Sequence, residues 1–223
     1  MSKLELTDEK IYRIVKGFVK NHTIMFMYHC GARAYGTVDE ASDIDVSVIM
    51  ADINGSMHMQ IGGLDVFIYG VDTYLEKQSL KDNIPIYYKM HIDDVINIDK
   101  NLIFLDDRFI NEYNAYKDIK LEENLKSFLS SFVKYYTVRE VDHPGPAKTL
   151  YHIFRIRGLL DHFDKVGKYE MIIEEPWKSK LFTYKKNWNN DIGLSMMEEV
   201  KEQLEYIKNY VERLWEIWTG KTF

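Results

Sequence analysis

The sequence predicts an α+β fold, with a mixed β-sheet and helices over residues 1–118 and a C-terminal helical bundle over residues 119–223. In the first part, short apolar runs separated by glycine-containing turns indicate strands. In the second part, apolar residues recur at the three- and four-residue spacing of amphipathic helices. A chain of 223 residues is long enough to form two such lobes.

The N-terminal part should begin with a helix over residues 8–20, with Thr7 as its N-cap. Strands are expected over residues 23–30, 44–50 and 64–69. Residues 58–61 either form a hairpin with the last of these around Gly62 and Gly63, or belong to one strand broken by a bulge.

Two further segments of this part are expected to be irregular. Residues 31–36 are bounded by Gly31 and Gly36 and are expected to form a loop. Residues 73–107 fit neither the helical nor the strand period and contain Pro85, so mixed helix and loop is expected there.

The C-terminal part carries two clear helical stripes, over residues 121–136 and 197–218. Between them, Pro144 and Gly145 break the chain, and Pro146 suits the first turn of a new helix. The aromatic tail is expected to pack in the core rather than at a subunit interface; it contains Trp215, Trp218 and Phe223.

The composition is that of a globular chain, since 46% of its residues are hydrophobic and Pro and Gly are scarce. The first ten residues lack the apolar core of a signal peptide, and no stretch approaches the roughly 18 apolar residues of a membrane span. We therefore expect a soluble, cytoplasmic protein without membrane contact. Cys30 has no second cysteine to pair with, and its place at the end of an apolar strand indicates a small core residue rather than a nucleophile.

The charge is distributed unevenly along the chain. Residues 39–118 contain 16 acidic and 6 basic residues, a net charge of −10, whereas residues 120–190 contain 13 basic and 9 acidic residues, a net charge of +4. The total of −6 argues against indiscriminate nucleic-acid binding. This asymmetry has two interpretations: the acidic part holds a metal site beside an anion site in the basic part, or the charges are solvated and distributed by chance.

Two acidic residues mark the expected strand over residues 44–50. Side chains alternate between the faces of a strand, so Asp43 and Asp45 point the same way while Ile44 points into the opposite core. Two converging carboxylates repel each other unless a cation lies between them, and Mg²⁺ takes oxygen ligands of this kind. A D-x-D sequence taken alone more often consists of solvated acids.

A third carboxylate, Asp65, begins another expected strand. Three carboxylates can hold two metal ions about 4 Å apart, one activating the attacking oxygen and one neutralising the phosphates. The Gly31-Ala32-Arg33 loop before the D-x-D pair offers backbone amides that could hold phosphate oxygens.

These residues resemble a motif of the DNA polymerase beta superfamily of nucleotidyltransferases, in which a strand, a Gly-Ser loop and a strand bearing D-x-D follow one another. The match covers residues 30–50 and includes Ser42 directly before Asp43. The Gly-x-Arg-Ala-Tyr-Gly loop is similar to that of a predicted bacterial and phage branch, which also carries a Lys-x-x-x-His-x-x-Arg pattern in a C-terminal helical region. Here the pattern is carried by Lys148, His152 and Arg155.

The resemblance implies a catalytic nucleotidyltransferase domain over residues 1–118. Its expected reaction is attack by an acceptor hydroxyl on the α-phosphate of a nucleoside triphosphate such as ATP, with release of pyrophosphate. Asp43, Asp45 and Asp65 would hold Mg²⁺, as two ions, or Mn²⁺ in its place, and Asp65 would help to deprotonate the acceptor. The implied nucleotide contacts are Gly31, Ala32, Arg33, Ser42, Lys148, His152 and Arg155.

The family serine after the first glycine is Ala32 here, so a hydroxyl that commonly holds phosphate is absent. Arg33 and backbone amides would have to replace it. The acceptor is RNA, a protein side chain or a small molecule, and the sequence does not choose among them. Two other functions use the same features: a non-catalytic nucleotide-binding or interaction module, and a metal-dependent hydrolase that releases free monophosphate.

Overall fold

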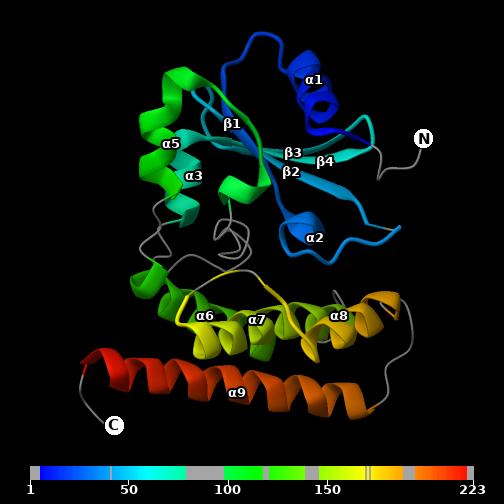
Figure 1. Ribbon diagram of the computed structural model, residues 1–223, viewed down its shortest axis with the longest axis vertical. Helices are drawn as coiled ribbons and strands as arrows, with labels where there is room; N and C mark the ends of the chain where they lie inside the picture. Colours follow the sequence, from blue (N-terminus) through cyan, green and yellow to red (C-terminus); the bar gives the residue numbers. More distant parts are fainter. Residues whose placement is uncertain are drawn as a thin grey trace. The chain divides into compact units, whose positions relative to one another are not determined.

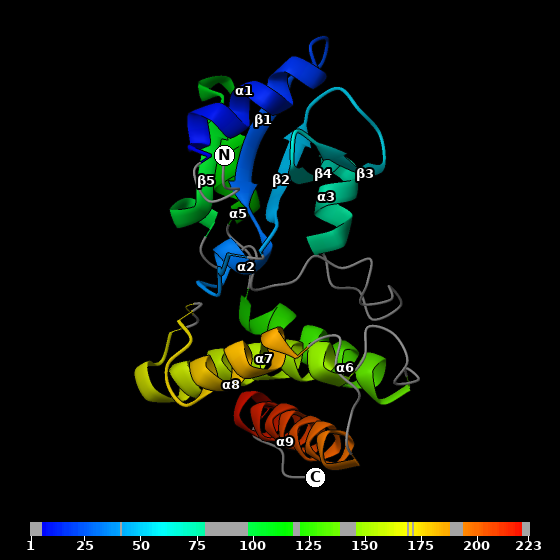
Figure 2. The ribbon, with the colours of Figure 1, turned by 90° about the vertical axis from the view of Figure 1, so that its right-hand side faces the viewer.

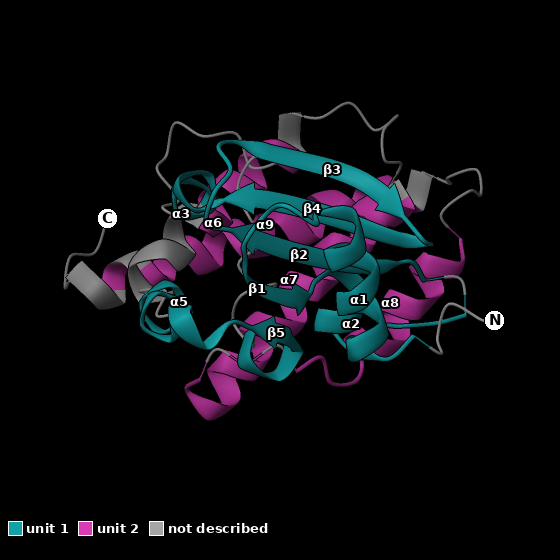
Figure 3. Ribbon diagram, turned by 90° about the horizontal axis from the view of Figure 1, so that it is seen from above, with its two compact units in different colours: residues 1–79, 90–119 teal, residues 80–89, 120–223 magenta. Residues whose placement is uncertain are grey.

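A computed structural model describes residues 6–40, 42–78, 98–117, 121–138, 146–168, 170, 172–187 and 194–219. The chain divides into two compact units (Figure 3). One is Met1–Ser79 with Met90–Ile119, and the other is Leu80–Lys89 with Lys120–Phe223. The first contains the sheet, and the secondary-structure elements described in the second are all helices. The fold is therefore α+β, as the sequence predicts.

The first unit contains a mixed sheet. Within the described residues its strand order is β3-β4-β2-β1-β5. β2 and β4 are parallel, whereas the other neighbours are antiparallel. The strands are β1 (Ile24–His29), β2 (Ile44–Met50), β3 (Ser56–Ile61), β4 (Leu64–Gly70) and β5 (Leu102–Leu105).

β3 and β4 form a hairpin, which is the first of the two arrangements that the sequence allowed. Gly62 and Gly63 form its turn with φ values of +58° and +84°, which only glycine adopts at little cost. The hairpin leads directly into a parallel pairing of β4 with β2. Asp65 is thereby carried on the strand that neighbours Asp45.

Helices cover both faces of this sheet (Figure 1). Ile11 and Val15 of the first helix belong to one apolar cluster with alternate residues of β2 and β4. Tyr74 and Tyr113, from two other helices, belong to the cluster on the opposite face. The helical segments of the unit are α1 (Asp8–Phe18), α2 (Gly31–Ala34), α3 (Val71–Gln78), η3 (Ile98–Asn101), η4 (Asp107–Phe109) and α5 (Ile110–Lys117).

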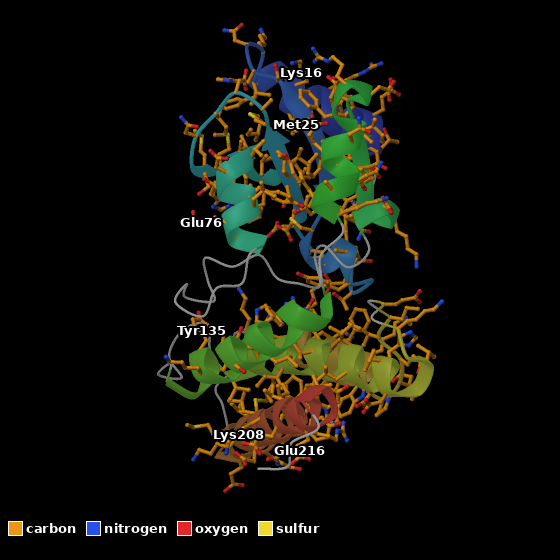
Figure 4. The ribbon with its side chains drawn as sticks, turned by 90° about the vertical axis from the view of Figure 1, so that its left-hand side faces the viewer. Lys16, Met25, Glu76, Tyr135, Lys208 and Glu216 are labelled. Atoms are coloured by element: carbon orange, nitrogen blue, oxygen red, sulfur yellow. The ribbon has the colours of Figure 1, made fainter. Side chains whose placement is uncertain are left out.

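Burial within this unit follows the sequence pattern. Thr7 caps α1 as predicted, its side chain accepting a hydrogen bond from the Lys10 amide at 3.4 Å. Met25 on β1 is 2% exposed and lies in the interior, whereas Glu76 on α3 is exposed (Figure 4). Cys30 is buried, as expected of a core residue.

The second unit is built around one central helix. α7 packs against both α8 and α9, and α6 packs against α9 (Figure 2). On α9, Ile207 and Leu214 of the predicted apolar stripe are buried, while Lys208 and Glu216 are exposed (Figure 4). The helices are α6 (Leu121–Val138), α7 (Pro146–Val166), α8 (Trp177–Lys186) and α9 (Leu194–Thr219). No described helix combines the length and the apolar character needed to cross a membrane.

The structure corrects two predictions. The expected loop over residues 31–36 begins with the one-turn helix α2, because Ala32, Arg33 and Ala34 are good helix formers and Gly31 permits the left-handed backbone at its start. Within residues 73–107, Leu102–Leu105 is strand β5 rather than helix or loop. Four apolar residues show no period, and this strand owes its place to pairing with β1. Pro85 lies outside the described residues.

Candidate active site

Asp45 and Asp65 lie directly opposite each other on adjacent parallel strands. Paired residues of neighbouring strands point to the same face, and adjacent strands are about 4.8 Å apart. Ile44 and Leu64 belong to the cluster beneath α1, so alternation directs the two carboxylates toward the opposite face. Both residues are half-buried. The structure thus brings two of the three predicted acidic residues together at the starts of β2 and β4.

Asp43 is exposed and lies just before β2, beyond the paired part of the sheet. The preceding Ser42 is 9% exposed and fixes the turn that leads into the strand. Its hydroxyl donates to Asp39 Oδ1 at 2.8 Å and accepts from the Asp39 amide at 2.8 Å. Ser42 therefore has a structural role, and its contact with a nucleotide stays a prediction.

Gly31 lies against the carboxylate of Asp45. A Cβ atom at position 31 would be 1.9 Å from Asp45 Oδ2, and the backbone has a φ of +62°. Next to it, the Cys30 amide donates to the Asp45 carbonyl oxygen at 3.0 Å. Both the space and the backbone conformation require glycine here. The glycine that begins the predicted phosphate loop thus also determines where the Asp45 carboxylate lies.

The other two predicted loop residues lie in α2. Ala32 is half-buried, and its carbonyl oxygen accepts from the Thr37 amide at 2.9 Å. Arg33 is also half-buried, and its Nε is buried without a hydrogen-bond partner in the described part of the chain. A phosphate oxygen is an acceptor suited to this Nε–H group.

His29 is a polar residue near this site that the sequence pattern did not indicate. Its Nε2 is 2.8 Å from Asp8 Oδ1, and the residue is 8% exposed. Burial lowers the pKa of His29; the Asp8 carboxylate opposes this shift and the nearby Arg33 adds to it. Its position directly before Cys30 and the Gly31 motif is the signal that could have identified it.

His58 is a second residue that was missed. Its Nε2 lies 2.9 Å from Asp65 Oδ1, and its ring stacks on Phe67 with a centroid separation of 4.4 Å and an interplanar angle of 6°. The hairpin register produces this contact, because it places Phe67 opposite His58 and Asp65 opposite Gln60.

The carboxylates offer oxygen ligands of the type that Mg²⁺ prefers. In the described residues, no three His, Cys, Asp or Glu side chains form a group that could hold a metal ion. Mg²⁺ is usually held by one or two carboxylates together with water and substrate phosphates rather than by a complete protein cage. The in-register Asp45 and Asp65 fit that mode of binding in donor chemistry.

Asp72, the nearest competing acid in sequence, is exposed in the first turn of α3. α3 follows the end of β4 that is opposite to Asp65, and a seven-residue strand spans roughly 20 Å. The position of Asp72 therefore favours Asp65 as the partner of Asp45.

The three basic residues of the C-terminal pattern lie on α7. Arg155 is 1% exposed, whereas Lys148 and His152 are half-buried. The His152 ring lies 6.2 Å from that of Tyr136 and 5.4 Å from that of Tyr151. These three basic residues of α7 therefore do not form a fully solvated face.

The Lys-x-x-x-His-x-x-Arg pattern does not include Arg157, another cation of α7. Arg157 donates to Gln203 Oε1 at 2.8 Å and stacks on the rings of Tyr206 and Trp177, so it joins α7 to α9 and α8. Of the predicted aromatic tail, the side chains of Trp215 and Trp218 and the whole of Phe223 lie outside the described part of the structure.

Comparison with protein-family models gives no match, and comparison with curated proteins gives none either. Among solved structures, the chain is similar to a nucleotidyltransferase-like protein from Exiguobacterium sibiricum 255-15. The two are 11% identical with a TM-score of 0.33, and the match covers 92% of this chain and 74% of that one. An identity of 11% gives no residue-by-residue correspondence, so the case for the site rests on its own geometry.

Proposed function

We propose that this protein is a metal-dependent nucleotidyltransferase that transfers a nucleoside monophosphate from a nucleoside triphosphate to an acceptor hydroxyl. One observation carries the proposal: Asp45 and Asp65 are paired on adjacent parallel strands, and Gly31 lies against the carboxylate of Asp45. Placing two carboxylates side by side is unfavourable unless a cation offsets their repulsion. The arrangement is therefore easier to explain as a binding site than as a structural feature.

In this proposal Asp45 and Asp65 hold Mg²⁺ together with phosphate oxygens, Mn²⁺ can substitute for it, and Asp43 is the predicted third carboxylate. The bound ions would neutralise phosphate charge and favour ionisation of the acceptor hydroxyl. The acceptor oxygen bonds to the α-phosphorus while the bond from that phosphorus to the pyrophosphate oxygen breaks. Asp65 takes up the acceptor proton, and pyrophosphate leaves.

The chain's other contribution is to position the triphosphate. The backbone amides of Gly31 and Ala32 and the guanidinium of Arg33 are the proposed phosphate contacts near the carboxylates. Arg33 takes the place of the hydroxyl that is absent at Ala32. Lys148, His152 and Arg155 stay predicted triphosphate contacts, to be tested by substitution.

Incubation with Mg²⁺ and each α-labelled nucleoside triphosphate, alone and with cell extract, tests the proposal. We expect metal-dependent release of pyrophosphate and a label attached to RNA, protein or a small molecule, and we expect neither with Asp45→Asn. Binding without turnover would instead support a non-catalytic nucleotide-binding module. Free labelled monophosphate without a modified acceptor would support a hydrolase.

A further inference from the structure

Asp65 has a partner on the neighbouring strand that no motif contains. His58 of β3 approaches the Asp65 carboxylate through its Nε2, 2.9 Å from Oδ1. An ionised carboxylate has no proton to donate, so His58 is the donor and its proton lies on Nε2. The side chain of Asp65 is 18% exposed and that of His58 is 56% exposed. The bond therefore reaches from the surface of the hairpin to the partly buried carboxylate.

The imidazole ring of His58 stacks on a side chain of the neighbouring strand β4. Phe67, directly opposite His58 in the register, lies parallel to the imidazole with the ring centroids 4.4 Å apart. Such stacking restricts rotation of the exposed ring and keeps its Nε2 directed at the Asp65 carboxylate. Phe67 itself is half-buried against the apolar cluster on this face. His58 is thus fixed by two contacts, although more than half of its side chain is exposed.

We infer that His58 is a positioning residue for the Asp65 carboxylate. This inference rests on the proposed function, because it concerns how Asp65 is presented to a metal ion. By engaging Oδ1, His58 limits rotation of the carboxylate and leaves Oδ2 as the oxygen that meets a cation or an acceptor hydroxyl. Hydrogen-bond partners of metal-binding carboxylates commonly change metal affinity or activity by about 10- to 100-fold when removed.

The local register supplies a control for this role. Gln60 lies directly opposite Asp65 and is exposed, but the hydrogen bond to the carboxylate comes from His58. A second control is His22, whose Nδ1 is 3.4 Å from Asp52 Oδ1 elsewhere in the same unit. Gln60→Ala removes a polar neighbour of Asp65, and His22→Ala removes an imidazole beside another aspartate.

The test measures binding of Mn²⁺ alone, followed by the electron paramagnetic resonance signal of the free ion. We expect His58→Ala to weaken Mn²⁺ binding at least about 10-fold. His58→Gln keeps an N–H donor on a side chain of similar reach, so it should stay within about threefold of the wild type. Gln60→Ala and His22→Ala should bind as the wild type does. A loss in His58→Ala that His58→Gln does not restore would indicate a merely structural effect and overturn the inference.

Pyrophosphate release, measured on the same variants, separates this inference from the proposed function. If the wild type binds Mn²⁺ and His58→Ala binds it equally well, the positioning role is wrong and the transferase proposal stands. If His58→Ala weakens Mn²⁺ binding and His58→Gln restores it, but the wild type releases no pyrophosphate with any nucleoside triphosphate, the transferase proposal fails and the positioning role stands. A wild type that binds no Mn²⁺ overturns both.

Discussion

Gly31 and Asp45 are in such close contact that no other side chain fits at position 31. A Cβ there would lie 1.9 Å from Asp45 Oδ2 and 2.8 Å from Asp45 Cγ. The contact joins the beginning of α2 to the beginning of β2. The position of the Asp45 carboxylate on β2 therefore depends on the absence of a side chain at Gly31 in α2.

We therefore expect Gly31→Ala to impair metal binding through Asp45. The variant combines two effects: a left-handed backbone that costs about 1–2 kcal/mol for a residue with a Cβ, and displacement of the carboxylate. Gly36→Ala is the matched control, because Gly36 has a φ of +68° but a Cβ added there would meet nothing within 4 Å among the described residues. Both variants should lose stability in urea unfolding, but only Gly31→Ala should lose Mn²⁺ affinity. Equal Mn²⁺ affinity in the two variants would show that the contact does not position Asp45.

Asp43→Asn and Asp45→Asn should abolish metal-dependent transfer without unfolding the chain, since asparagine keeps the volume but not the charge. Without metal, Asp45→Asn should not lower the melting temperature, because it removes repulsion between carboxylates that lie directly opposite each other.

Asp65→Asn should slow transfer strongly and reduce nucleotide binding less. The control is Asp72→Asn. An inactive Asp72→Asn beside a normal Asp65→Asn would mean that the third carboxylate is misassigned.

The sequence was sufficient to predict β1, β2 and β4, but not which strands lie beside one another in the sheet. The apolar run ending at Met50 indicated β2, and the glycines at 62 and 63 indicated either a hairpin or a bulged strand, because burial and turn geometry are local signals. The pairing of Asp45 with Asp65 was not predictable, because register depends on which strands meet in the folded sheet. The contact of His58 with Asp65 depends on that same register and was missed for the same reason.

Short elements were missed for a different reason. α2 and β5 have four residues each, fewer than are needed for a helical or strand period to be recognised. The burial of Arg155 was also not predictable, because a Lys-x-x-x-His-x-x-Arg spacing looks the same on an exposed helix as on a central one. Only the packing of α7 against α8 and α9 distinguishes the two cases.

The lowered pKa of His29 should make stability depend on pH. Its folded pKa lies below the ordinary value of 6.5 because burial disfavours the charged form. Below pH 6.5 the unfolded chain gains its proton first, so stability is fully present above that pH and is lost as the pH falls toward the folded pKa. The loss cannot exceed about 1.4 kcal/mol per pH unit.

Urea unfolding between pH 7.5 and 5 would measure this effect in the wild type and in His29→Gln. The wild type should lose more stability on acidification than the variant, which has no imidazole to protonate. His22→Gln, which removes an exposed imidazole from the same unit, is the control. Parallel pH profiles for the wild type and His29→Gln would contradict the prediction.

The cations of α7 differ in how deeply they are buried. Arg155 is 1% exposed, so Arg155→Ala would leave a cavity in a packed interior and should cost about 2–5 kcal/mol of stability. That variant therefore cannot report on ligand binding alone. Lys148 is half-buried, and Lys148→Ala should change stability much less.

Calorimetric titration with a non-hydrolysable triphosphate is the measurement that decides whether these residues bind the ligand. Charge-assisted hydrogen bonds contribute about 1.5–3 kcal/mol, so Lys148→Ala should weaken affinity by roughly 10- to 150-fold. Arg155→Lys keeps the charge but loses the planar guanidinium, and it should weaken binding by a smaller factor while remaining folded. His152→Ala should cost less than Lys148→Ala unless the imidazole is protonated. Lys178→Ala, an exposed lysine of α8, is the control, and unchanged affinity in both Lys148→Ala and Arg155→Lys would assign these cations to the packing of the helical unit alone.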